Sequence, residues 1–274
     1  MEKHWKVTVW GVRGSQPTPA QEFLEFGGNT ACTSVDCGGE TVVFDAGTGL
    51  AELGKALKAR GGVKRAHLFL SHLHLDHVIG LAFSPLLMDP AVELHLYGEA
   101  GDGKSLWERL NTLVGGAYWP LNLAEFPAHI LIHEVGPDAC FPLAGQERIT
   151  VQTLRGNHPG GSLLYRLEGD GRSLVYGLDC ETDETTFSAL ADFARGCRLV
   201  IWDANFTAGD LIAGWGHSTW EQGIALRRAA GAGEILMTHH NYHYIDTFLW
   251  EQERLAREQD GACVFAREGM VLDI

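Results

Sequence analysis

The feature that most constrains this chain is the stretch of residues 71–80, which holds three imidazoles and a carboxylate within six residues. It follows the apolar residues 67–70, which are typical of a buried strand. On a helix the four side chains would spread around the circumference, whereas a tight loop after a strand can direct them in two pairs to two adjacent points. Imidazole and carboxylate suit zinc and similar first-row ions. The pattern therefore predicts two neighbouring metal sites, one at His72 and His74 and one at Asp76 and His77.

Composition narrows the classes of partner that we expect. The chain has 274 residues, of which 45% are hydrophobic, enough for a large core. It carries 21 Lys and Arg against 35 Asp and Glu, a formal net charge of −14. A protein this acidic is poorly suited to hold a long polyanion through its phosphates, so we expect that long nucleic acid is not a partner. Bound divalent ions would offset part of the charge locally.

The same composition predicts a cytoplasmic protein with no membrane partner. Residues 1–6 lack the apolar core of a signal peptide, and no stretch approaches the apolar length that spans a bilayer. The six cysteines are scattered without a Cys-x-x-Cys pair, which indicates reduced thiols in a cytoplasmic setting. The oligomeric state cannot be predicted from these features.

Strands and helices alternate along the chain, which favours an α/β architecture. No linker or low-complexity segment interrupts it, so we expect one domain over residues 1–274. Residues 98–135 are the least regular part and are interpreted either as a lid or substrate wall, or as an ordinary surface excursion. Predicted strands cover 6–10, 32–37, 41–44, 63–70, 94–97, 129–132, 149–154, 163–167, 174–178, 199–203, 234–238 and 263–266. Predicted helices cover 50–60, 105–113, 182–193, about 217–230 and about 247–259.

Several further polar residues directly follow apolar runs, as His72 does. These are Asp45, His158, Asp179 and His239. Strand ends that meet on one rim would collect them around the first motif. Each has an ordinary alternative: Asp45 as an acid at a helix start, and each histidine as a loop residue. His240 beside His239 leaves the last candidate ligand ambiguous, and His239 is preferred because it follows the strand most directly.

Together these residues resemble the signature of the metallo-β-lactamase superfamily. The resemblance spans essentially the whole chain and implies an αββα sandwich, in which two mixed sheets lie face to face with helices outside. It implies two divalent metal ions, with zinc the first choice and Mn or Fe as alternatives. By this resemblance one ion is held by His72, His74, His158 and Asp179. The other is held by Asp76, His77, His239 and the same bridging Asp179.

Two motifs are similar to the phosphodiesterase-like branch, which includes the ribonuclease Z, carbon–phosphorus-lyase-pathway phosphodiesterase and class II cyclic-nucleotide phosphodiesterase families. They are residues 27–30, Gly-Gly-Asn-Thr, and residues 216–219, Gly-His-Ser-Thr. The resemblance implies that His217 serves the reacting phosphate. We expect Ser218 and Glu221 to form a capping box at the start of the helix that follows. Asp45, Asp203 and His240 are the candidates for orienting the groups that bind metal or substrate.

The leading hypothesis is a dinuclear metal-dependent hydrolase acting on a small phosphodiester, including a cyclic nucleotide, as its small-molecule partner. A hydroxide shared by the two ions would be the nucleophile. Asp76 would orient it, and His217 would stabilise a phosphoryl oxygen or protonate the leaving alkoxide. Hydrolysis of carboxylic esters, lactones or thioesters by the same site is the alternative, and a non-catalytic metal-binding protein is the third. Transfer-RNA processing is disfavoured by the net charge of −14 and by the lack of a basic arm.

Overall fold

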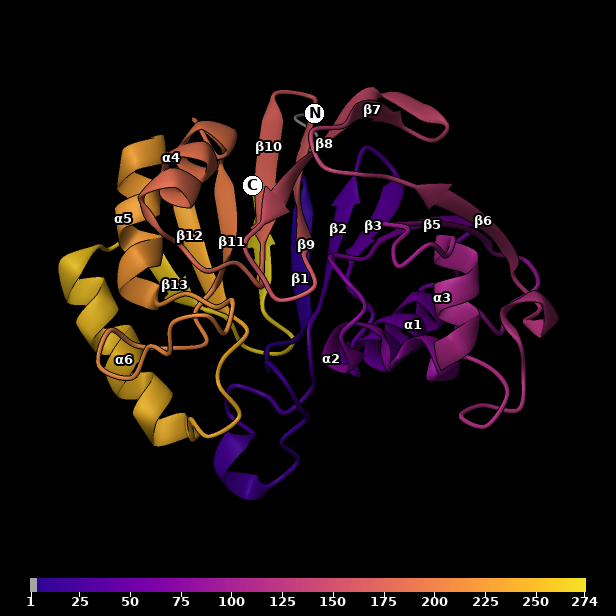
Figure 1. Ribbon diagram of the computed structural model, residues 1–274, viewed down its shortest axis with the longest axis horizontal. Helices are drawn as coiled ribbons and strands as arrows, with labels where there is room; N and C mark the ends of the chain where they lie inside the picture. The colour runs from indigo at the N-terminus through magenta and orange to yellow at the C-terminus, as the bar shows by residue number, and fades with distance from the viewer. Residues whose placement is uncertain (1–3) are drawn as a thin grey trace.

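The computed structural model describes residues 4–274, and within them the chain forms two seven-stranded sheets packed face to face (Figure 1). The first sheet has the order β14 (Val271–Asp273), β1 (Lys6–Gly11), β2 (Cys32–Cys37), β3 (Glu40–Phe44), β4 (Arg65–Phe69), β5 (Glu93–Gly98) and β6 (His129–Glu134). The second has the order β13 (Cys263–Phe265), β12 (Glu234–Thr238), β11 (Leu199–Asp203), β10 (Arg172–Gly177), β9 (Ser162–Gly169), β8 (Gln146–Gly156) and β7 (Cys140–Leu143).

Each sheet is mixed. Strands β3 to β6 run parallel, as do β10 to β13, whereas β14, β1, β2 and β3 pair antiparallel, as do β7 to β10. Both faces of the central strands are covered, which is why β3 and β11 are buried at every position.

Helices cover the outer faces of both sheets (Figure 1). On the side of the first sheet lie α1 (Gly49–Ala59), α2 (Leu75–Val78) and α3 (Leu106–Leu113), and on the side of the second lie α4 (Glu184–Phe193), α5 (Trp220–Ala230) and α6 (Asp246–Gln259). Short 3₁₀ turns occupy η1 (Gln21–Phe23), η2 (Leu81–Phe83) and η3 (Leu123–Glu125). The predicted αββα sandwich is confirmed. None of the helices between residues 4 and 274 is long and apolar enough to cross a membrane.

The core between the sheets is built from large apolar and aromatic side chains contributed by both. Phe44 of β3 stacks on Tyr176 of β10 with ring centroids 4.8 Å apart, and Phe69 of β4 lies 5.2 Å from Tyr165 of β9. All four side chains are at most 1% exposed. Fully burying one side chain of this size contributes about 1.5–3 kcal/mol, so these contacts hold the two sheets in a fixed relation.

One local prediction was wrong. The N-cap of α5 is Thr219, whose hydroxyl accepts a hydrogen bond from the backbone amide of Gln222. In return, the side-chain oxygen of Gln222 accepts from the backbone amide of Thr219. Ser218 and Glu221 therefore do not form the capping box. The Ser218 hydroxyl instead donates to the carbonyl of Cys180, which leaves His217 in the loop before the helix.

Candidate dinuclear metal site

The predicted ligands meet at one edge of the sandwich because the relevant strands all end there. Strands β3, β4, β10, β11 and β12 run parallel within their sheets, and β8 is parallel to β10 because both are antiparallel to β9. Carboxyl ends of parallel strands lie at the same sheet edge, so the segments that follow them are brought together. Seven side chains from these segments form what we call the metal cluster: His72, His74, Asp76, His77, His158, Asp179 and His239.

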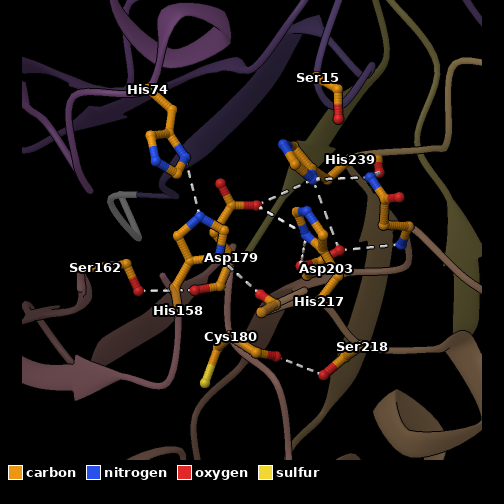
Figure 2. A network of polar contacts seen from close by, with 12 residues as sticks. Ser15, His74, His158, Ser162, Asp179, Cys180, Asp203, His217, Ser218 and His239 are labelled. Atoms are coloured by element: carbon orange, nitrogen blue, oxygen red, sulfur yellow. Dashed lines mark hydrogen bonds and ion pairs between the residues drawn. The ribbon is translucent and has the colours of Figure 1, made fainter. Parts of the chain in front are cut away.

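Asp179 lies at the centre of the metal cluster (Figure 2). Its Oδ2 is 2.7 Å from His77 Nε2 and 3.3 Å from His72 Nε2, and its Oδ1 is 3.1 Å from His239 Nδ1. The residue is 1% exposed. Burial favours the neutral acid, but the neighbouring His239 and His77 outweigh burial and hold the pKa of Asp179 well below its usual range. A buried ionised carboxylate shared by several imidazoles is suited to bridge two cations.

Three ligand atoms on one side of Asp179 have the spacing of a metal coordination shell. Asp76 Oδ2 lies 3.3 Å from both His77 Nε2 and His239 Nε2, and the two nitrogens are 3.2 Å apart. Tetrahedral ligands at ~2.0–2.1 Å from a zinc ion are ~3.4 Å from one another. The triangle therefore fits a first-row divalent ion with little movement of the side chains.

The remaining ligands lie on the other side of Asp179. His74 Nδ1 is 3.0 Å from His158 Nε2, and the rings of His72 and His158 are 4.8 Å apart. Within residues 4–274, His72 Nε2 is a buried polar atom with no hydrogen-bond partner, and it lies 3.3 Å from Asp179 Oδ2. Leaving such an atom unpaired is costly, and a bound cation would satisfy it. The donor set thus fits a second ion at His72, His74 and His158, with Asp179 between the two sites.

Asp45 holds part of the first motif in place. Its Oδ1 accepts from the Ser71 amide at 2.7 Å, and its Oδ2 accepts from the Ser71 hydroxyl and from Tyr176 at 2.8 Å each. The same Oδ2 lies 2.7 Å from His77 Nδ1, so Nε2 of His77 is the atom that faces the metal cluster. A carboxylate that fixes the orientation of a ligand imidazole is a common feature of metal sites.

His217 and Asp203 form a buried pair beside Asp179. His217 Nδ1 donates to Asp203 Oδ2 at 2.8 Å and lies 3.3 Å from Asp179 Oδ1. Burial alone would lower the pKa of His217, but the charge of Asp203 and hydrogen bonds with Asp179 and Asp203 raise it to about 11. Figure 2 shows this pair on the same side of Asp179 as His239. The imidazole is thus held next to the cluster with its Nδ1 occupied.

The structure separates the two neighbours His239 and His240. His239 directs its Nε2 to the cluster, whereas His240 Nε2 lies 3.1 Å from the carbonyl of Ala266. Burial and the positive charges of Arg13 and Arg267 lower the pKa of His240 to about 3. Those cations would repel a metal ion. His240 is therefore not brought to the metal cluster, and its ring does not contact the groups that it was expected to orient.

Three of the residues at this edge adopt the left-handed backbone conformation. Asp45, Asp179 and His239 have φ of 59°, 54° and 58°, each directly or shortly after a strand. For residues with a Cβ this conformation is uncommon and costs on the order of 1 kcal/mol. It reverses the chain at once after the strand, so the side chain turns back over the sheet edge. Such strain at three converging polar residues is typical of a functional site.

Some supporting residues were missed in the sequence. Ser71 and Tyr176 hold Asp45, and the Ser15 amide donates to Asp76 Oδ2 at 2.7 Å, which brings the loop after β1 to the cluster. Asn205 donates to the His239 carbonyl at 3.1 Å. A Cβ on Gly14 would lie 2.4 Å from Asn205 Nδ2, so only glycine fits there. No spacing rule in the sequence signals these contacts.

The Gly-rich turn of residues 27–30 contacts the C-terminal segment and the residue before α1. Asn29 hydrogen-bonds to Glu268 through its amide and its side chain, and Thr30 exchanges hydrogen bonds with Thr48. The turn therefore supports the start of α1 and the C-terminal segment. Contact with the metal cluster is made instead by Ser15, in the loop after β1.

Comparison with known proteins places this geometry in a family. Residues 40–240 match the model of the beta-lactamase superfamily domain. Ribonuclease Z of Nitrosopumilus maritimus is 20% identical over 321 residues, covering 98% of this chain and 99% of that protein. The metallo-beta-lactamase fold protein YhfI of Bacillus subtilis superposes with a TM-score of 0.74 at 22% identity, covering 99% of this chain and all of that one. The short form of human tRNase Z gives a TM-score of 0.67 at 18% identity, covering 97% and 98%.

These findings correct one prediction. The expectation that long nucleic acid is not a partner is wrong, because a relative that covers nearly the whole chain is named a ribonuclease. Net charge is a sum over the whole surface and does not describe the charge near one site, least of all a site that binds cations. Because the family model covers residues 40–240 and several groups of potential metal ligands converge at Asp179, the chain belongs to the metallo-β-lactamase superfamily, in its phosphodiesterase-like branch, and is a metal-dependent hydrolase.

Proposed function

We propose that this protein is a dinuclear metal-dependent phosphodiesterase. The observation that carries the proposal is His217, which is held by Asp203 beside the bridging carboxylate and stands outside the metal ligand set. In a phosphodiester the leaving alkoxide is poor and the phosphoryl group is charged. Its hydrolysis therefore needs a hydrogen-bond donor that is not itself a metal ligand. A thioester or an activated ester, whose leaving group departs without a proton, does not need such a group.

The residues that would hold the two ions are those of the metal cluster, with zinc the first choice and Mn or Fe as alternatives. When bound, the ions would supply an activated water as nucleophile and would neutralise charge on the phosphoryl oxygens. The chain does the positioning: Asp45 fixes His77, and the Ser15 amide fixes the Asp76 carboxylate. The Ser15 amide donates to Oδ2 of Asp76, which leaves Oδ1 of the same carboxylate to orient the attacking water.

His217 would act on the substrate through Nε2. Its Nδ1 donates to Asp203, so the ring orientation is fixed and Nε2 is the remaining donor. From there it would donate to a phosphoryl oxygen or pass a proton to the leaving oxygen. Asp203 acts through His217 and is a positioning residue.

The test is His217→Ala, assayed on two substrates after loading with Zn²⁺ or Mn²⁺. Removing a group of this kind typically costs on the order of 100-fold or more in turnover. We expect that loss on a cyclic nucleotide with retained metal content, and a smaller loss on bis-para-nitrophenyl phosphate, whose leaving group needs no proton. Retained phosphodiesterase activity in the variant, or lactone or thioester hydrolysis in the absence of phosphodiester hydrolysis, would contradict the proposal.

Two substrate classes are candidates. The first is a small phosphodiester, including a cyclic nucleotide. The second is an RNA phosphodiester, which is supported by the similarity to the ribonuclease Z of Nitrosopumilus maritimus. The bond that is cleaved is the same, so the metal cluster and His217 serve both. Comparing kcat/KM for 2′,3′-cyclic AMP with that for a transfer RNA bearing a 3′ trailer decides between them.

A further inference from the structure

A cavity of about 260 Å³ opens beside His217. Its walls come from the loop after β1, the segment from β11 to His217 and the segment after β12. The lining residues that matter here are Ser15, Asn205, Phe206, Trp215, His217 and Tyr242. Because His217 is part of the wall, a group attached to the oxygen that His217 serves would extend into this cavity.

One wall carries Trp215, an indole that is 58% exposed. The loop that bears it is held rigidly: the Glu181 carboxylate accepts from the amides of Gly214 and Gly216, at distances from 2.8 to 3.0 Å. The carbonyl of Gly216 lies 2.9 Å from His158 Nδ1 and so links the loop to the metal cluster. More than half of this aromatic surface is therefore open to solvent, on a loop that ends at His217.

A second part of the lining is also tied to the metal cluster. Asn241 donates to Asn205 Oδ1 at 3.0 Å, and Asn205 donates to the carbonyl of His239 at 3.1 Å. Tyr242 follows Asn241, with its ring 4.1 Å from that of His243. The rings of Trp215 and Tyr242 and the side-chain amides of Asn205 and Asn241 thus line the cavity. Hydrogen bonds fix the position of this lining relative to the metal cluster.

The charge of the cavity limits what it accepts. Among the described residues, the lining includes one carboxylate, Asp210, and neither lysine nor arginine. Both oxygens of this carboxylate are engaged, by Thr207 and by Tyr244. Away from His217 the described lining thus offers no lysine or arginine to pair with an anionic group, whereas an uncharged planar ring would find aromatic faces and amide hydrogen-bond partners.

From the position and lining of this cavity we propose that it is the leaving-group subsite and that it binds a nucleobase, with Trp215 as the residue that selects for it. The inference rests on the proposed phosphodiesterase function. In the reaction the oxygen of water bonds to phosphorus and the bond from phosphorus to the nucleoside oxygen breaks. The nucleoside oxygen takes a proton from His217, the proton that the water loses goes to solvent, and His217 regains a proton from solvent. Base stacking on an aromatic side chain tolerates all bases, because every base presents a π-face.

The test compares two substrates that share adenosine and differ in the group that leaves. In adenylyl-adenosine a nucleoside leaves, whereas in the methyl ester of adenosine 5′-phosphate methanol leaves. We expect Trp215→Ala to lower kcat/KM by about 10-fold or more for adenylyl-adenosine and by less than about 3-fold for the methyl ester. Trp215→Phe should restore most of the loss, because it keeps a stacking face. Equal losses on the two substrates would overturn the assignment of the cavity.

A binding measurement without turnover separates this inference from the proposed function. Saturation-transfer NMR should show contact of adenosine H2 and H8 with the wild-type protein and a strong decrease in Trp215→Ala. The matched control is Trp250→Ala, which removes a tryptophan that is 47% exposed on α6. It should leave both the NMR signal and the substrate ratio unchanged. If wild type hydrolyses neither diester, the phosphodiesterase function fails, and unchanged adenosine contact in Trp215→Ala overturns the subsite in either case.

Discussion

Two groups of closely packed histidines lie within residues 4–274, and only one of them has the features of a metal site. The first is the metal cluster. The second, which we call the histidine stack, consists of His67, His95 and His133 on the adjacent strands β4, β5 and β6. The stacked rings lie about as close as those of the metal cluster, with centroids 5.0 Å apart for His67 and His95 and 5.1 Å apart for His95 and His133.

The ring nitrogens of the stack have partners within the protein. His95 Nδ1 lies 2.8 Å from His133 Nε2, and His95 Nε2 lies 3.0 Å from Glu93. His67 Nε2 lies 3.4 Å from Glu40, a carboxylate that is already bound by the guanidinium of Arg65. Within residues 4–274 the groups of three or more closely spaced potential ligand atoms all fall at the metal cluster and the adjoining Asp203 and His217.

The comparison shows that the number of imidazoles does not by itself make a metal site. In the metal cluster, carboxylates approach several imidazoles at once, and a ring nitrogen of His72 stays unpaired. In the stack, neighbouring rings pair with one another and with side chains that carry their own counter-charge. A cation adds favourable interactions in the first arrangement and would have to break existing ones in the second.

The largest expected effect comes from removing the shared carboxylate of the metal cluster. Asp179→Asn should reduce the metal content from about two ions per chain to less than one, because both sites lose their common ligand. Activity should fall below detection. Metal content is measured by inductively coupled plasma mass spectrometry after dialysis. The control His95→Asn, in the histidine stack, should keep the full metal content. Two retained ions in Asp179→Asn would show that Asp179 does not bridge.

The next effect distinguishes the neighbours at the end of β12. His239→Ala should lose the ion held with Asp76 and His77, whereas His240→Ala should keep both ions. The reason is that the His239 ring faces the cluster and the His240 ring faces the Ala266 carbonyl. Metal titration monitored by competition with a chromogenic chelator gives the stoichiometry of each variant. The opposite ranking of the two variants would assign the ligand to His240.

A smaller effect is expected where a carboxylate only orients a ligand. Asp45→Asn should weaken metal affinity by about 10- to 100-fold and leave the stoichiometry at saturation unchanged. The amide can still accept one hydrogen bond but no longer carries the charge that favours His77 Nδ1–H. Isothermal titration with Zn²⁺ against the wild type measures the change. An unchanged affinity would mean that Ser71 and Tyr176 fix the loop without Asp45.

The smallest effect concerns the histidine stack and its response to acid. Burial and the neighbouring His95 lower the pKa of His67 from 6.5 to about 4, despite its contact with Glu40. Arg65 also opposes protonation, and Tyr97 is the remaining polar side chain at hydrogen-bonding distance. The folded state therefore binds fewer protons than the unfolded state between pH 6.5 and 4. Stability is fully present above pH 6.5 and should fall across that window by about 1–3 kcal/mol.

The measurement is urea unfolding at several pH values between 7 and 4. In His67→Asn the decrease of the unfolding free energy with falling pH should be shallower than in wild type, because the group that takes up the proton is gone. His129→Asn is the control, since that histidine is exposed at the start of β6. Parallel pH curves for wild type and His67→Asn would show that the stack does not titrate on unfolding.

The first half of the metal cluster could be predicted from the sequence because it is local. His72, His74, Asp76 and His77 lie within six residues of one loop, so the backbone alone keeps them together. The fold class was likewise predictable from the alternation of strands and helices. The interpretation of residues 98–135 as a lid or substrate wall, or as an ordinary surface excursion, stays a prediction. Arg109, Leu113 and Tyr118 of this segment line a cavity of about 530 Å³ together with Leu73 and Leu75, which flank His74 in the chain.

The second half required the tertiary structure. His158, Asp179, His217 and His239 are spread over 82 residues of the chain, and no spacing rule relates them. They meet because parallel strands end at a common edge and because left-handed residues turn Asp179 and His239 back over it. Contacts such as Tyr176 to Asp45, 131 residues apart, join the two sheets and depend on how the sheets pack.

The sequence by itself therefore determined the metal-binding loop, the α/β class and the residues that follow apolar runs, because these depend on neighbours in the chain. The tertiary structure decided that His239 and not His240 faces the metal cluster, and that Ser218 is not the cap of α5. It also decided which histidines form the histidine stack instead of a metal site. Those outcomes depend on which partner each buried polar atom finds, and the partners come from distant segments.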